Sequence, residues 1–251
     1  MKTRLLNGTY LFLSSRRLTL ALLVYAVLLV FVATLAQREI GIAAVQKLYF
    51  ESFFLLAGFG TVKFPLVGGA TVGALALLNI VFSGLRYSRF GVAGLGTSIA
   101  HMAVALLIVS GALQYFLRVD GNMTLLPNAE SDTVVLSDAK HTVLRLPFSV
   151  RLKKFTEEKW AGSSIAKGYS SEIVFVKSGA ETESTVSMNN PASFAGWTFY
   201  QMSYGRDGSS VLGAVKNPAR LLPWLAVGMA FFGMIVVFLP RAFGRDGNER
   251  R

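Results

Sequence analysis

Four long apolar segments interrupt an otherwise mixed pattern of polar and hydrophobic positions. None of them contains Asp, Glu, Lys or Arg, and they span residues 18–35, 66–85, 92–116 and 221–239. Each is close to the ~20 residues that a helix needs to cross a bilayer. We therefore predict four transmembrane helices, three within residues 18–117 and the last over residues 220–240.

The first apolar run follows a basic leader, residues 1–17. A cleaved signal peptide is the alternative, but its apolar core usually spans ~7–15 residues and ends at a small-residue cleavage site. This run is longer, and its last residues (Ala33, Thr34, Leu35, Ala36) fit such a site poorly. We favour a retained helix.

Residues 38–63 form a short outer loop of mixed polarity. Its apolar positions recur at near-helical spacing, which predicts an amphipathic helix at the membrane interface with Tyr49 and Phe50 at headgroup level. An outer loop with a short helix is the alternative. In the next crossing, Gly69-x-x-x-Gly73 has the spacing that lets two membrane helices approach closely.

Residues 118–219 change to short segments rich in β-branched and aromatic side chains, separated by turn formers such as Asn190–Pro191. Apolar residues fall mostly on alternate positions, as at Phe148, Val150 and Leu152, which is typical of half-buried strands. We predict an all-β domain, a small β-sandwich or an open barrel. Within residues 197–204, Trp197 and Phe199 share one face, which indicates core packing or an aromatic surface for a partner.

Composition supports a membrane protein, since 53% of the residues are hydrophobic and only 16% are charged. The net charge of +11 needs no nucleic acid to explain it. Placing both termini in the cytoplasm and the β domain outside puts most basic residues of the short segments inside. These are Lys2, Arg4, Arg16, Arg17, Arg86, Arg89, Arg241, Arg245, Arg250 and Arg251, the last four in a cytoplasmic tail (residues 241–251), against Arg38, Lys47 and Lys63 in the outer loop.

The chain has no cysteine. This excludes thiol–disulfide exchange, covalent haem attachment through a C-x-x-C-H motif, and a Cys-based metal site in this sequence.

One ionisable side chain, His101, lies inside the third apolar segment. At ~1.5 Å per residue it is roughly 15 Å beyond Gly91, near mid-membrane. An imidazole there is costly unless paired and is a candidate functional site. Three interpretations are open: a packing residue hydrogen-bonded to a neighbour such as Asn79, a haem ligand, or a proton relay. The relay is weakened because the crossings hold no Asp or Glu.

Helical spacing places mostly small residues on the His101 side of the helix, namely Gly94, Thr97, Ser98, Ala105, Ile108 and Ala112. Such a face admits either a tightly packed helix or a flat macrocycle. A neutral imidazole binds iron well, and its second ring nitrogen needs a partner. Thr97 and Asn79 are the candidates. His141, the only other histidine, most simply lies in a solvated turn.

Four stretches carry a family likeness: Gly96-Thr-Ser-Ile-Ala-His101, Asp120-Gly-Asn-Met-Thr-Leu, Asn189-Asn-Pro-Ala-Ser-Phe-Ala-Gly-Trp-Thr-Phe-Tyr-Gln-Met-Ser-Tyr204 and Lys216-Asn-Pro-Ala-Arg220. Together with the order of helices and strands, they resemble the ResB-like (CcsB) proteins of cytochrome c biogenesis. The resemblance runs from about Phe64 to Leu239.

The resemblance implies a multi-pass protein of the bacterial inner membrane that helps carry haem across the membrane and present it to apocytochrome c. It implies haem b, shared with a CcsA/ResC-type partner that has a tryptophan-rich segment, and His101 as one axial ligand to the haem iron. This chain has three widely separated tryptophans, so that segment is expected from the partner. No enzymatic activity is expected of this chain alone. The alternative is a membrane scaffold that binds no haem.

Overall fold

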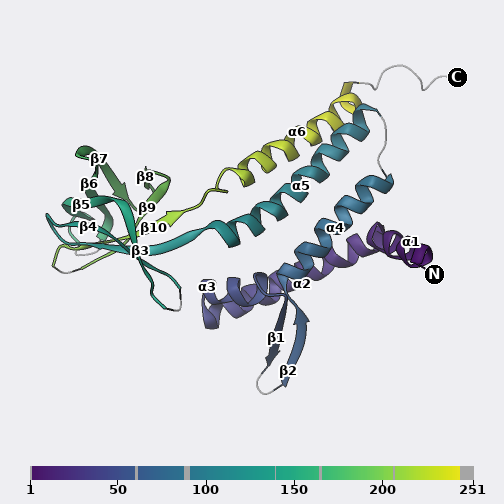
Figure 1. The fold of residues 1–251 in the computed structure, drawn as a ribbon, viewed down its shortest axis with the longest axis horizontal. Coiled ribbons are helices and arrows are strands. Elements are labelled where there is room, and N and C mark those ends of the chain that lie inside the picture. The colour runs from purple at the N-terminus through teal and green to yellow at the C-terminus, as the bar shows by residue number, and fades with distance from the viewer. Residues whose placement is uncertain are drawn as a thin grey trace. The chain divides into compact units, whose positions relative to one another are not determined.

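The computed structural model describes residues 2–59, 62–87, 91–138, 140–163, 166–205 and 207–243. The chain divides into two compact units, Met1–Tyr115 with Arg220–Arg251, and Phe116–Ala219. The first unit contains the long helices and the second contains a large sheet (Figure 1). Several basic residues of the sequence argument lie outside the described ranges, namely Arg89, Arg245, Arg250 and Arg251.

Within the described residues, four helices are long and apolar enough to cross a membrane. They are α2 (Arg16–Ile40), α4 (Gly69–Tyr87), α5 (Val92–Leu117) and α6 (Leu222–Phe243). At most 17% of the most apolar stretch of any of these helices is buried inside the chain. Large apolar side chains are left exposed on the helix surfaces, for example Val27 at 69%. The predicted apolar helices are therefore confirmed, and their outer surfaces suit a lipid environment.

A separate helix, α1 (Lys2–Leu13), forms in the basic leader and ends in a turn before α2. Ser15 begins α2 as its N-cap, because its Oγ accepts a hydrogen bond from the backbone N–H of Arg17 at 3.2 Å. The ring of Tyr10 packs edge-on against the ring of Phe82 in α4, with centroids 5.8 Å apart. The leader is thus attached to the helices that follow.

The outer loop differs from the predicted amphipathic helix. A short helix, α3 (Ile42–Val45), continues as a π-helical turn, η1 (Gln46–Phe50), and is followed by a hairpin of β1 (Phe54–Phe59) and β2 (Val62–Val67). The helical spacing breaks down after Phe50, where burial alternates: Leu55 is buried while Phe54 and Leu56 are exposed. A period of two fits this run as well as a helical period does.

The Tyr49 side chain packs inside the chain and is not exposed on its surface. It is only 7% exposed and packs in a cluster with Leu29, Ala33, Val45 and Leu55. Phe50, the other predicted interfacial residue, is 38% exposed. The difference arises because the short helix folds back against α2 and buries one side of the turn.

Two glycines mark the true start of the second crossing. Residues 66 and 67 belong to β2, so α4 begins three residues later than the apolar run suggested. A Cβ on Gly68 would collide with the backbone oxygen of Ser52, and one on Gly69 would meet the Cα of Phe50 at 2.7 Å. The lack of a side chain at Gly69 therefore allows close contact with the preceding loop and not with a second long helix. A Cβ on Gly73 would make only an ordinary contact, 3.7 Å, with Ile108 of α5.

The second unit is one antiparallel sheet of eight strands in the order β7-β6-β5-β4-β3-β10-β9-β8 (Figure 1). The strands are β3 (Val119–Leu125), β4 (Glu130–Leu136), β5 (Val143–Lys159), β6 (Ala166–Lys177), β7 (Ala180–Ser187), β8 (Ala192–Phe194), β9 (Trp197–Tyr204) and β10 (Ser210–Lys216). The first and last strands of this unit, β3 and β10, are neighbours in the interior of the sheet, with Val119 opposite Lys216. The all-β prediction is confirmed.

The strands form one continuous sheet that curls upon itself, and not two separate sheets. Ser171 of β6 donates to Oε1 of Gln201 in β9 at 2.7 Å, and its Oγ lies 2.8 Å from that of Ser210 in β10. These strands are far apart in the sheet order, so only strong curvature brings them together. One apolar core, with Phe175, Phe199 and Leu212 fully buried, fills the concave side. The open-barrel alternative is the closer description.

Candidate functional site

His101 lies on α5 with its ring orientation fixed by the helix itself. Its Nδ1 is 2.8 Å from the backbone oxygen of Thr97, one turn earlier. A carbonyl oxygen can only accept, so Nδ1 carries the hydrogen and donates it. The neutral ring then keeps its lone pair on Nε2. Thr97 is therefore the partner of the second ring nitrogen, through its backbone carbonyl.

The imidazole is exposed to an open cleft of about 820 Å³ between three helices. This volume lies inside the ~300–1,000 Å³ range of ligand pockets. The lining is mostly apolar and comes from α2 (Arg16, Thr19, Leu20, Leu23), α4 (Ile80, Val81, Ser83, Gly84, Leu85, Tyr87) and α5 (Gly94, Thr97, Ser98, His101, Met102, Ala105).

The predicted face of α5 corresponds closely to this lining. Gly94, Thr97, Ser98, His101 and Ala105 all border the cleft, as their shared helical spacing predicted. Ile108 and Ala112, from the same predicted set, do not. The cleft therefore lies beside the N-terminal half of α5.

The opposite side of α5 provides close packing against α6. A Cβ built on Gly96 would lie 2.8 Å from the backbone oxygen of Gly233, and one on Gly233 would lie 2.7 Å from the backbone nitrogen of Ala100. The two helix backbones thus meet at paired glycines. Tight helix packing and the histidine-lined cleft occupy different faces of the same helix, so the small residues around His101 are not needed for this contact.

Asn79, a candidate for the His101 environment, bonds elsewhere. It is 1% exposed, and its Oδ1 accepts from the Thr19 hydroxyl at 2.6 Å. Its Nδ2 donates to the backbone oxygens of Leu13 at 2.6 Å and Ser15 at 3.2 Å. The side chain holds the α1–α2 turn against α4. The interpretation of Asn79 as a hydrogen-bond partner of His101 is therefore wrong.

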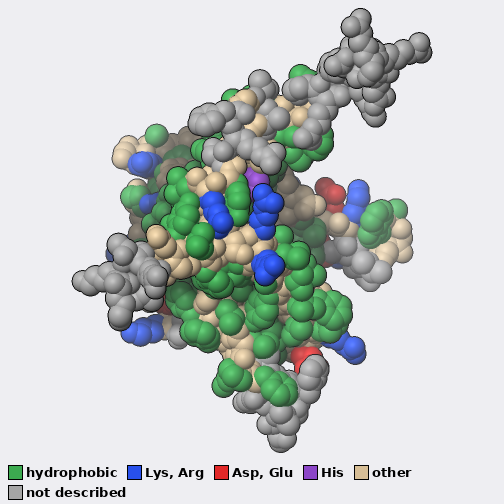
Figure 2. Space-filling view, turned by 90° about the vertical axis from the view of Figure 1, so that its right-hand side faces the viewer, with side chains coloured by type: hydrophobic (Ala, Val, Ile, Leu, Met, Phe, Trp, Pro, Cys, Tyr) green, Lys and Arg blue, Asp and Glu red, His purple; other side chains and the backbone are tan. Residues whose placement is uncertain are grey.

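A basic group stands at the rim of the cleft. The guanidinium carbon of Arg16 lies 4.6 Å from the ring centroid of Tyr87, and that of Arg86 lies 5.1 Å from the same centroid. Both distances are typical of cation–π contacts. Arg86 also donates from Nη1 to the Oγ of Ser14 at 2.9 Å. Figure 2 shows blue Lys and Arg side chains gathered above a green apolar surface on this side.

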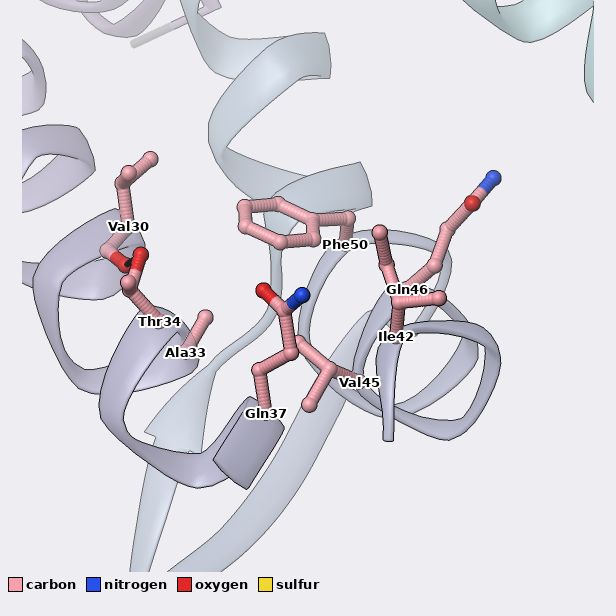
Figure 3. Close-up of a pocket in the computed structure, with 8 residues that line it drawn as sticks. All are labelled: Val30, Ala33, Thr34, Gln37, Ile42, Val45, Gln46 and Phe50. Carbon is pink, nitrogen blue, oxygen red and sulfur yellow. Dashed lines mark hydrogen bonds between the residues drawn. The ribbon is translucent and has the colours of Figure 1, made fainter. Parts of the chain in front are cut away.

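A smaller cavity of about 380 Å³ lies between α2 and the α3–η1 segment (Figure 3). Its lining comprises Val30, Ala33, Thr34, Gln37, Ile42, Val45, Gln46 and Phe50. None of these side chains is a histidine or carries a charge, so this cavity offers no iron ligand. The chemistry is concentrated in the cleft that contains His101.

His141 lies in an exposed turn of the β unit, as predicted. Its φ is +48°, and its backbone N–H donates to the carbonyl of Asp138 at 3.2 Å. Hydrogen bonds from the Thr142 hydroxyl and backbone N–H, with a smaller contribution from His141, lower the pKa of Asp138. Among the described residues, no group of three or more His, Asp or Glu could hold a metal ion.

Strand β9 divides as its alternation predicted. Trp197 and Phe199 are buried, at 4% and 0% exposure, and belong to the core of the sheet. Tyr200 and Met202 point outward, at 42% and 61% exposure. Core packing therefore accounts for the first pair of residues.

Comparisons with known proteins identify a family and two similar proteins. The ResB-like family model matches residues 90–236, more than half of the chain and a range that contains His101. Protein NrfI of Wolinella succinogenes is 31% identical over 93 residues, which are 36% of this chain and 10% of NrfI. Cytochrome c heme lyase CcmF is similar in structure with a TM-score of 0.41 and 13% identity, over 90% of this chain and 35% of that one. The chain belongs to the ResB-like family.

Proposed function

We propose that this protein is a membrane component of c-type cytochrome maturation that helps carry haem across the bacterial inner membrane and present it to apocytochrome c. One observation carries the proposal: His101 lines an open, mostly apolar cleft while its Nδ1 is held by the carbonyl of Thr97, so that Nε2 is the nitrogen left to bind a ligand. This is the arrangement of a histidine that binds haem iron through one nitrogen.

The residues of the cleft suit haem b. Apolar side chains such as Leu20, Leu23 and Ile80 suit the macrocycle, and Gly94 and Ala105 leave space beside the imidazole. Bound haem would supply the iron centre whose delivery is the purpose of the site. The chain contributes one axial ligand, an apolar wall and a fixed ring orientation, and performs no covalent chemistry alone.

The second axial ligand is proposed to come from a CcsA/ResC-type membrane protein. The cleft holds one histidine, and the sequence has only one other, His141, in the β unit. One ligand from each of two proteins would allow haem to be bound at their interface and then released to an acceptor.

The proposed orientation has both termini in the cytoplasm and the β unit outside. Arg16, Arg17 and Arg86 lie at the end of α2 and α4 that the positive-inside rule assigns to the cytoplasm. An outward β unit is then available to a partner or to apocytochrome c. The exposed Tyr200 and Met202 of β9 give it an apolar patch for such a contact.

The ligand assignment is tested by the absorption spectrum of the chain co-purified with its partner. We expect His101→Ala to lower bound haem at least tenfold or to shift the Soret band, and added imidazole to restore the spectrum. Thr97→Val is the matched control, because it changes a lining side chain and keeps the carbonyl that holds Nδ1. An unchanged spectrum and full cytochrome c maturation in His101→Ala would leave the scaffold function, without haem, as the explanation.

A further inference from the structure

We propose that Arg16 binds the carboxylates of haem at the rim of the cleft, so that the macrocycle lies with its charged edge toward the basic end of the helices. The inference rests on the proposed function, because it takes haem as the ligand of His101. It adds an orientation of the macrocycle within the cleft.

The first observation is that Arg16 and His101 border the same cleft from different helices. Arg16 is the first residue of α2, and His101 lies three turns into α5. The cleft is thus mostly apolar along its walls, and a cation and an imidazole border it from different helices. A ligand that matches both features has an apolar body, a coordinating centre and an anionic edge.

The second observation is the position of the guanidinium. It lies over the Tyr87 ring, 4.6 Å from the centroid, and Tyr87 also lines the cleft. Stacking on an aromatic face orients an arginine and leaves its N–H donors free at the edges. The neighbouring Arg86 already donates to Ser14 and to the backbone oxygen of Leu11. Among the residues that the structure describes, the Arg16 side chain makes no hydrogen bond to the chain.

The third observation is the lack of an opposing charge. Residues 1–38 and 52–119 contain no Asp or Glu. The ion pairs among the described residues all involve Arg118 or side chains of the sheet. Among the described residues, no carboxylate forms an ion pair with Arg16. A cation at the mouth of an apolar cleft attracts anions, and an arginine binds carboxylates in a bidentate geometry.

The positive-inside rule explains why a basic residue stands at the start of α2. It does not explain why Arg16 borders the cleft. Arg17 satisfies the positive-inside rule equally well and does not border the cleft. Only Arg16 combines the charge with the ring stacking and the lining position. Arg17 is therefore the matched control for any change at Arg16.

The test compares binding of haem with binding of haem dimethyl ester, in which both carboxylates are masked. The complex of this chain with its partner, stripped of haem, is titrated with each compound in nanodiscs, and the Soret absorbance gives the dissociation constant. We expect Arg16→Gln to weaken haem binding roughly tenfold, the loss of one charged hydrogen-bonding contact, and to leave ester binding unchanged. Arg17→Gln should change neither constant.

Arg16→Lys keeps the charge and the membrane orientation, so it protects the test against a misinserted Arg16→Gln chain. It should retain the preference for haem over the ester in part. Equal effects of Arg16→Gln on haem and ester would overturn the inference, as would equal effects of Arg17→Gln. If the Arg16→Gln effect appears only in nanodiscs of anionic lipid, the arginine binds a lipid phosphate instead, which also overturns it.

The two proposals fail in different ways. If His101→Ala leaves the spectra of bound haem and bound ester unchanged, the haem function itself is lost. If His101→Ala changes both spectra and Arg16→Gln changes neither constant, only the anchoring by Arg16 is lost.

Discussion

An imidazole whose Nδ1 hydrogen is bonded to the carbonyl one turn earlier presents a single, defined nitrogen to its surroundings. His101 is in this state, and it needs no second side chain to reach it. The sequence indicated that the other ring nitrogen would need a partner but suggested side chains for it. Every residue has a backbone carbonyl, so residue types alone do not predict which carbonyl accepts the hydrogen bond. Thr97 was predicted as a partner because it lies one turn before His101 on the same helix.

Asn79 illustrates the opposite case, in which a polar residue in an apolar segment has a structural role. Its three hydrogen bonds fasten the turn between α1 and α2. A buried amide in a membrane helix suggested proximity to the histidine, and only the fold shows that its partners come from the N-terminal segment. The sequence contained one usable signal, the turn-forming pair Ser14–Ser15.

We expect Asn79→Leu to lower the stability of the chain by about 1–3 kcal/mol, because buried groups of Thr19, Leu13 and Ser15 lose their partner. The thermal unfolding midpoint in detergent measures the change. Asn189→Leu, in an exposed turn, is the control and should leave the midpoint nearly unchanged. The haem spectrum should be the same in both variants. If Asn79→Leu changed the haem spectrum as His101→Ala does, Asn79 would have to be part of the haem site.

At the scale of elements, α5 separates two roles by face. One side carries Gly96, which touches α6 at Gly233, and the other carries His101 and the cleft. The 3.6-residue period predicted the histidine face correctly, since spacing alone determines which side chains share it. The partner helix could not be predicted this way. Gly69-x-x-x-Gly73 has the better-known spacing, yet the close helix contact occurs at isolated glycines.

The glycine contact predicts a sharp difference between two substitutions on α5. Gly96→Val would place a side chain against the α6 backbone and should cost about 1–3 kcal/mol through overpacking. Gly111→Val is the control, because no atom lies within 4 Å of a Cβ built there. The measurement is the thermal unfolding midpoint of each variant, which should be lower for Gly96→Val than for Gly111→Val. Equal midpoints would mean that α5 and α6 do not depend on the Gly96 contact.

The short outer loop and the sheet show where periodicity is insufficient. Phe53 and Leu56 fit a helical stripe, but Phe53 directly precedes β1, and Leu56 pairs within the hairpin next to the buried Leu55. In the sheet, alternation identified buried positions such as Phe148 and Val150 correctly. It could not distinguish two packed sheets from one curled sheet, because both bury one face of every strand.

For the whole molecule, the order of helices and strands predicts on which side of the membrane each segment lies. The hairpin between β6 and β7 offers a site to test it, since Ser178 and Gly179 both have positive φ and form a tight exposed turn. Alkaline phosphatase fused at Ser178 should be active, because the β unit is proposed to be outside. A fusion after Tyr87, at the basic end of α4, should be inactive. The reverse pattern would invert the proposed orientation.

The pairing of β3 with β10 has a consequence for how the protein is made. The β3–β10 ladder joins Val119 to Lys216, so its two strands are nearly the first and the last parts of the β unit to leave the ribosome. Such distant pairing forms slowly, after a long loop has closed. Strands β4 to β7 pair with their neighbours in sequence and can fold beforehand. Completion of the sheet therefore waits for the segment just before α6, and the last helix is synthesised when the sheet is ready to close.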